Sequence, residues 1–178
     1  MSDWPLYSGV RRTAYGANTT ASAGTQISYT VANQKGGWNQ VASSTAHDAH
    51  AVWLAIWGET SSTDILVDVG VGSAGNEVVV LPDLLIVSRD STAAQPTVVR
   101  LPCFIPGGSR VAIRFQNSTG VATLRYIVSI EQAGGLWPPE FQRITAYGIN
   151  TADSGATSID PGGSANAKGD YSEIEDST

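Results

Sequence analysis

The chain has 178 residues, a net charge of −6 and only 15% charged residues, and its isoelectric point is about 4.7. This length suits one domain, and the acidic balance argues against binding to nucleic acid or to an anionic membrane. A single cysteine excludes an internal disulfide, and no uninterrupted apolar stretch approaches ~18 residues, so we expect a soluble protein made in a cytoplasm.

The first segment of the chain is repeated near its end. Residues 11–27 read RRTAYGANTTASAGTQI, and residues 143–159 read RITAYGINTADSGATSI. They align without a gap at an offset of 132 and are identical at ten of seventeen positions, where chance would supply roughly one or two. The chain is therefore one complete unit followed by the opening of another.

The repeat extends on both sides of this core. Trp4-Pro5 precedes the first copy and Trp137-Pro138 precedes the second, and after one inserted residue the likeness resumes between residues 33–41 and 166–174. Only about 40 residues belong to the second copy, and one or two strands cannot bury a core of their own. We interpret the repeated unit as a docking segment, with each Trp-Pro pair as its anchor.

The middle of the chain has the pattern of β-strands, because apolar residues alternate or form short runs between Gly, Pro, Asn and Ser. We predict eight strands, at residues 26–32, 38–42, 50–57, 64–71, 77–87, 97–104, 110–116 and 121–131. The expected fold is all-β, an antiparallel β-sandwich or jelly roll. It is divided into an N-terminal segment (1–25), the sandwich body (26–132), and a linker with a C-terminal arm (133–178).

Two short motifs suggest a ligand, and each has a simpler structural explanation. Gly70-Val-Gly72-Ser-Ala-Gly75 matches a dinucleotide-binding pattern, but the next residues read as a strand instead of the required helix, which favours a hairpin. His47, Asp48 and His50 are weak candidates for a metal site, because no third strong ligand follows nearby. We therefore expect no cofactor and no metal.

Other reactive or aromatic side chains are expected to be structural. Cys103 lies in an apolar strand, which favours core packing and an inert thiol. Asp64, Asp68, Glu77 and Asp83 could gather at one end of a sheet and bind calcium, but their spacing matches no known loop. Trp38, Trp53 and Trp57 could form a sugar platform if exposed, although Trp53 and Trp57 share one face of a strand and are expected in the core.

Four segments of the middle region carry a resemblance to a known class of proteins. They are Trp38-Asn-Gln-Val-Ala-Ser-Ser-Thr, Asp64-Ile-Leu-Val-Asp-Val-Gly-Val-Gly, Asn76-Glu-Val-Val-Val-Leu-Pro-Asp-Leu-Leu and Ile105-Pro-Gly-Gly-Ser-Arg-Val-Ala-Ile-Arg. In these segments the chain resembles small β-sandwich virion structural proteins of tailed bacteriophages, of the capsid decoration (cement) or fibre-associated type. The resemblance implies a β-sandwich that assembles on a virus particle.

The leading functional hypothesis is a non-enzymatic capsid decoration or cement protein, made in the host cytoplasm and located in the virion. We expect the chain to assemble through its terminal arms into a homo-oligomer, a trimer, and to contact other virion proteins such as the major capsid protein. The expected interface residues are Trp4, Tyr15, Ile27, Trp38, Trp137, Tyr147, Ile149, Ile159 and Tyr171.

Two alternatives remain open from the sequence. One is a receptor- or carbohydrate-binding module associated with a tail or head fibre, which would use loops and aromatic residues of the same sandwich. The other is an enzyme with a metal at His47, Asp48 and His50. The sequence also leaves open whether the second repeat copy binds its own chain or a neighbour.

Overall fold

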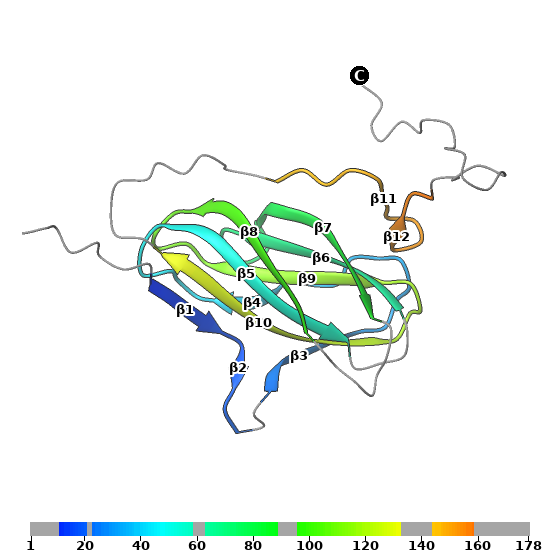
Figure 1. Ribbon diagram of the computed structural model, residues 1–178, viewed down its shortest axis with the longest axis horizontal. Helices are drawn as coiled ribbons and strands as arrows, with labels where there is room; N and C mark the ends of the chain where they lie inside the picture. The colour runs from blue at the N-terminus through cyan, green and yellow to red at the C-terminus, as the bar shows by residue number, and fades with distance from the viewer. Residues whose placement is uncertain (1–10, 21–22, 59–62, 89–95, 133–143, 159–178) are drawn as a thin grey trace, which may run out of the picture.

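The computed structural model describes residues 11–20, 23–58, 63–88, 96–132 and 144–158, which form an all-β sandwich (Figure 1). The eight strands of its body are β3 (Ala23–Tyr29), β4 (Asn39–Ala42), β5 (Ala49–Gly58), β6 (Thr63–Val71), β7 (Val78–Ser88), β8 (Thr97–Ile105), β9 (Val111–Asn117) and β10 (Ala122–Gln132). Each matches a predicted strand. Seven agree to within one residue at each end, and β3 lies three residues earlier than expected. No helix in the described residues is long and apolar enough to cross a membrane.

The strands form two antiparallel sheets with jelly-roll connectivity. Sheet 1 has the order β2-β3-β10-β5-β8, with β1 (Arg11–Tyr15) also paired to β10, and sheet 2 has the order β4-β9-β6-β7. Apart from the β6–β7 hairpin, which lies in sheet 2, successive body strands alternate between the sheets in the order that two Greek keys produce. This arrangement confirms the expected fold.

The core lies between the two sheets and follows the period-two alternation of the sequence. In β10, the side chains of Leu124, Tyr126 and Val128 are buried, while Arg125 and Ile127 point to the outer face and are half-buried. The thiol of Cys103 is also buried in this core, and burial raises its pKa to about 11, against a hydrogen bond from the Val52 backbone that lowers it. The predicted structural role of this cysteine is confirmed.

The predicted position of two tryptophans is wrong. In β5, Val52, Leu54 and Ile56 are buried in the core, whereas Trp53 and Trp57, at the alternate positions of the strand, are half-buried on the outer face. Strand β5 is apolar on both faces, so alternation alone did not distinguish the inner side. The indole N–H of a tryptophan also requires an acceptor when it is buried, and the outer face supplies one.

The N-terminal strands complete one edge of sheet 1. Residues 11–15 of β1 pair with residues 128–132 of β10, and β3 pairs with residues 122–126 of the same strand. Between them, β2 (Ala17–Asn18) turns away from β10 and pairs with the start of β3. Figure 1 shows the resulting hairpin projecting from the edge of the sandwich.

Candidate functional site

The two repeat copies form the same hairpin. In the N-terminal hairpin (residues 16–25), Ala17 pairs with Gly24 and Asn18 with Ala23. In the C-terminal hairpin (residues 148–157), β11 (Ile149–Asn150) pairs with β12 (Gly155–Ala156) in the register Ile149 to Ala156 and Asn150 to Gly155. Adding 132 to each number of the first register gives the second. The sequence repeat is therefore also a structural repeat.

The same residues close both hairpins at their base. The Thr25 hydroxyl donates to the Gly16 carbonyl at 2.9 Å, and the equivalent Thr157 donates its backbone N–H to the Gly148 carbonyl at 2.7 Å. Hydrogen bonds at equivalent positions hold both hairpins closed, although the donor atoms differ.

The N-terminal hairpin packs tightly against sheet 1. Arg125 donates from Nη1 to the Gly24 carbonyl at 3.2 Å. Gly24 lies so close to its neighbours that a Cβ atom there would be 2.5 Å from the Tyr126 carbonyl oxygen and 2.8 Å from the Trp57 ring. A side chain at this position would therefore displace backbone of β10.

The C-terminal hairpin contacts a different surface, the outer side of sheet 2. The Gln116 side-chain amide donates from Nε2 to the Thr151 carbonyl at 2.8 Å and to Ser154 Oγ at 3.1 Å, and Ser154 Oγ donates to Asn33 Oδ1 at 2.8 Å. Ser154 is fully buried. Upstream, the Ile144 N–H donates to the Val80 carbonyl of β7 at 3.1 Å. Residues 144–158 thus lie against their own chain, on sheet 2, whereas the N-terminal hairpin packs against sheet 1.

The expected interface residues have different environments. Tyr15 packs partly buried against the core, Ile27 is a core residue, Ile149 is half-buried in β11, and 52% of Tyr147 is exposed. Trp38 is half-buried between the Arg114 guanidinium, 4.4 Å from its ring centroid, and Gly70 of sheet 2. Trp4, Trp137, Ile159 and Tyr171 lie outside the described residues.

The tryptophan platform and the gathered carboxylates are both corrected by the structure. Trp38 contacts sheet 2 and Trp53 lies on the outer face of sheet 1, so the three tryptophans do not share a surface. Asp68 and Asp83 do adjoin, but both bind Lys35 Nζ, and Asp68 also accepts from Arg114 Nε at 2.8 Å. Basic side chains therefore occupy the position where a cation would bind.

The remaining carboxylates and histidines are placed elsewhere. Glu77 pairs with Arg110; burial alone would raise the pKa of Glu77, but hydrogen bonds from its backbone amide and from Arg110 hold it below its ordinary value. Asp48 Oδ1 accepts from the Gly107 N–H at 2.7 Å, and the His47 carbonyl accepts from Gln132. Within the described ranges, no group of three or more His, Cys, Asp or Glu residues is arranged to hold a metal.

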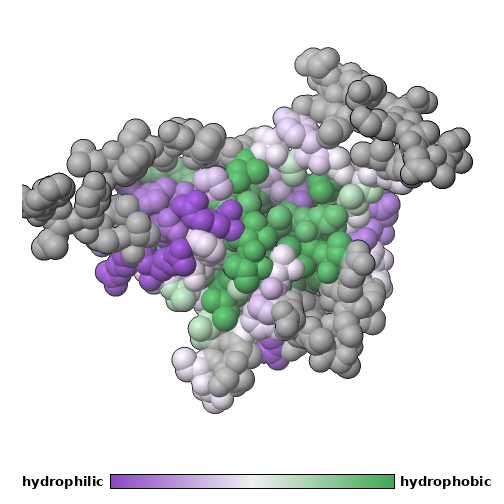
Figure 2. Space-filling view, viewed as in Figure 1, coloured by the Kyte–Doolittle hydropathy of each residue, from purple (hydrophilic) through white to green (hydrophobic). Residues whose placement is uncertain are grey.

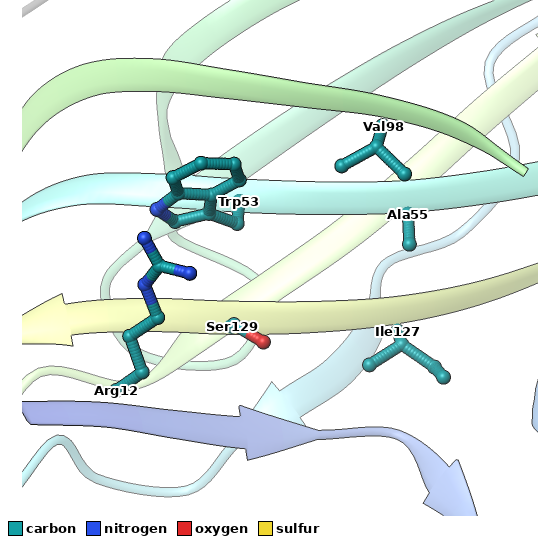
Figure 3. Close-up of a pocket in the computed structure, with 6 residues that line it drawn as sticks. All are labelled: Arg12, Trp53, Ala55, Val98, Ile127 and Ser129. Carbon is teal, nitrogen blue, oxygen red and sulfur yellow. The ribbon is translucent and has the colours of Figure 1, made fainter.

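A shallow depression lies on the outer face of sheet 1. It has a volume of about 270 Å³ and combines apolar side chains with the cationic Arg12 (Figure 3). Figure 2 shows hydrophobic residues at the centre of this face, with hydrophilic residues beside them. The lining residues are Arg12, Trp53, Ala55, Val98, Ile127 and Ser129.

An ion-pair cluster forms one wall of this depression. Glu131 accepts from Trp53 Nε1 at 2.7 Å and from Arg100 Nη2 at 2.8 Å, and Arg12 Nη2 lies 3.5 Å from the same carboxylate. The Arg12 guanidinium also stacks 4.0 Å from the Trp53 ring centroid. The hydrogen bond from Arg100 outweighs burial and, with those from Trp53 and the nearby charges, lowers the pKa of Glu131 to about 2.

Sequence reasoning missed this surface, although one signal was present. Arg12 is one of the positions where the repeat copies differ, because the second copy has Ile144 there. Arg12 stacks on Trp53, whereas Ile144 packs against the core. Exposed Trp and Arg side chains around an apolar floor are typical of protein interfaces.

No protein-family model matches the chain, and no curated protein matches it in sequence. Among solved structures, it is similar to infectious bursal disease virus, Gx strain, at 11% identity and a TM-score of 0.42, with 80% of this chain and 39% of that chain covered. It is similar to the infectious bursal disease virus VP2 subviral particle at 13% identity and a TM-score of 0.38, covering 80% and 39% of the two chains. Eiger TNF from S. frugiperda matches at 9% identity and a TM-score of 0.39, covering 75% and 98%.

The chain spans about two fifths of the length of the two viral chains that it matches. These TM-scores are all below 0.5. The assignment of a jelly roll therefore rests on the strand order of the chain itself.

Proposed function

We propose that the chain is a non-enzymatic structural protein of a virus particle, a capsid decoration or cement protein that assembles as a homo-oligomer through its repeated hairpin. The observation that carries the proposal is the repeat of one hairpin, in one register, against two different surfaces of the same sandwich. A jelly roll is an architecture that viral capsid domains use. The resemblance of residues 38–132 to virion proteins supports the same role.

The C-terminal hairpin is the segment that we propose to exchange between subunits. The hydrogen bonds from the rest of the chain to residues 144–158 involve a small set of groups, the Gln116 amide, the Asn33 side chain and the Val80 carbonyl. Every copy of the chain presents the same groups, so a neighbour's residues 144–158 can make the same hydrogen bonds. Such an exchange is a heterologous contact, because the arm of one subunit binds a different surface on the next subunit. The assembly has a finite size when the subunits form a ring. We propose a ring of three subunits, bound to the major capsid protein.

The N-terminal hairpin is suited to remain with its own chain. β1 and β3 pair with ten residues of β10 between them, and Gly24 packs against Tyr126. The C-terminal hairpin pairs only with itself and holds to sheet 2 mainly through side chains. The second copy therefore has fewer main-chain bonds to lose on transfer.

Two complementary variants test the exchange in the full-length chain. Ser154→Lys places a charged side chain at a buried position of the arm, and Gln116→Lys removes the amide that receives it. Each variant alone should be monomeric by size-exclusion chromatography with light scattering, while the wild type has three times the 18.6 kDa chain mass. An equimolar mixture should form a heterodimer, because one intact arm meets one intact docking site. A mixture that stays monomeric would refute the exchange.

The virion role has a separate test. Mass spectrometry of virus particles purified on a density gradient should find the chain at a fixed ratio to the major capsid protein. Recovery of the chain only in the particle-free fractions would contradict a structural role in the virion, whatever the oligomeric state.

A further inference from the structure

The outer face of sheet 1 is basic in an otherwise acidic protein. The outward-facing positions of its strands carry three arginines, Arg12, Arg100 and Arg125, and one carboxylate, Glu131. The whole chain has a net charge of −6. The charge of this face is therefore opposite to that of the chain as a whole.

The depression on this face has a net positive charge, because two arginines beside it form ion pairs with one carboxylate. The Arg12 and Arg100 guanidinium groups share the single carboxylate of Glu131, and their side chains remain 52% and 43% exposed. Beside them, Val98 is 57% exposed and Ile127 is half-buried. The geometry suits a ligand that places one apolar side chain on the floor and carboxylates against the arginines.

The chain itself contains a segment with this chemistry. Residues 170–176 read DYSEIED, and residues 159–178 as a whole carry five acidic side chains and one lysine, for a net charge of −4. In an extended strand, side chains two residues apart lie on one face, about 6.6 Å from each other along the strand. Tyr171, Glu173 and Glu175 therefore share a face, with an aromatic side chain followed by two carboxylates.

The distance from the C-terminal hairpin to this face is within reach. Eleven residues lie between Ser158 and Asp170, and the chain between these two residues spans up to about 40 Å when extended. The two sheets of a sandwich are only about 10 Å apart. A segment that starts at sheet 2 can therefore reach the outer face of sheet 1.

We propose that the depression lined by Arg12, Trp53, Val98 and Ile127 binds the acidic segment 170–176 of this chain as an extended strand. The Tyr171 ring lies on the apolar floor, and Glu173 and Glu175 pair with the exposed guanidinium groups of Arg12 and Arg100. This site is separate from the hairpin docking site at Gln116, and it does not depend on the exchange between subunits.

A peptide titration on the full-length chain tests the site. The chain carries Glu173→Lys and Glu175→Lys, so that its own tail no longer competes, and the probe is a fluorescent peptide of residues 168–178 followed by anisotropy. Binding should weaken as salt is raised. Adding Val98→Asp, which puts a carboxylate on the floor, should lower the affinity at least about tenfold.

A matched control separates the depression from a general charge effect. Val78 is 68% exposed and lies on β7 of the other sheet, so Val78→Asp should change the affinity by less than about twofold. Circular dichroism checks that both variants remain folded. Failure of the peptide to bind at millimolar concentration, or equal effects of the two substitutions, would overturn the proposal. A chain that binds the peptide but is monomeric upholds this site and rejects the oligomer.

Discussion

Gly16 and Gly148 lie 132 residues apart and adopt the same left-handed backbone conformation, with φ angles of 81° and 71°. Each precedes the first strand of its hairpin. A residue with a Cβ atom in this conformation costs about 1–2 kcal/mol, so glycine is favoured in both copies for the same local reason. The hairpin shape is therefore encoded within the repeat, while the surface that each hairpin contacts is not.

The position after the turn distinguishes the two copies. The first copy has Gly24, which packs against Tyr126 and Trp57, and the second has Ala156 at the equivalent position, where it is exposed. We expect Gly24→Ala to lower the free energy of unfolding by about 2 kcal/mol through overpacking, measured by urea denaturation. Ala156→Gly, the reciprocal control, should cost less than about 1 kcal/mol. Equal losses would contradict the packing explanation.

The Glu131 cluster should make stability depend on pH. Because the folded pKa is lowered from 4.5 to about 2, the carboxylate stabilises the fold above pH 4.5, and this contribution is lost as the pH falls toward 2. At pH 7, Glu131→Gln should reduce the free energy of unfolding by about 2 kcal/mol. The difference between wild type and variant should shrink steadily between pH 5 and pH 2 in denaturant titrations. A difference that does not change with pH would argue against the ion pairs as its source.

The buried thiol of Cys103 should be unreactive in the folded protein. Its pKa of about 11 leaves almost no thiolate at pH 8, and the side chain is buried in the core. Ellman's reagent should therefore modify no thiol in native buffer and one thiol per chain in 6 M guanidinium chloride. Rapid modification without denaturant would show that the core opens around β8.

The Lys35 cluster should respond to loss of its central charge. Lys35→Met leaves the carboxylates of Asp68 and Asp83 close together, with Arg114 as the remaining cationic partner of Asp68 beside the Asp83 N–H that donates to it, and we expect a loss of about 3 kcal/mol. Asp83 has a left-handed backbone, with φ of 51°, which asparagine also tolerates. Asp83→Asn in the Lys35→Met background should recover at least half of that loss in thermal denaturation, because it removes one unpaired charge. No recovery would contradict a charge-based explanation.

The strands of this fold could be predicted from sequence because alternation in β9 and β10 separates the two faces clearly. The same reasoning failed in β5, where both faces are apolar and the contact between Trp53 and Glu131 decides which side is outside. The sequence also did not predict which strands pair with one another. Nothing local in residues 11–15 specifies β10, more than a hundred residues later, as their neighbour.

The candidate sites were predictable to different degrees. The repeat located both segments but did not predict that they form hairpins, although the shared conformation follows from local residues such as Gly16 and Gly148. Their docking surfaces depend on Gln116 and Tyr126, which only the folded sheets bring near them. The depression around Trp53 joins side chains from β1, β5, β8 and β10, and no sequence pattern links four such distant strands.

The central place of β10 in sheet 1 also has a consequence for synthesis on the ribosome. β10 is the last strand of the body to be made, yet β1, β3 and β5 all pair with it. At about 5–20 residues per second, the first copy of the repeat waits several seconds for its partner strand. Once residue 132 has emerged, the first copy can pair immediately, before residues 143–159 have emerged. The order of translation therefore gives the first copy the earlier access to the β10 edge, without any need for a difference in affinity.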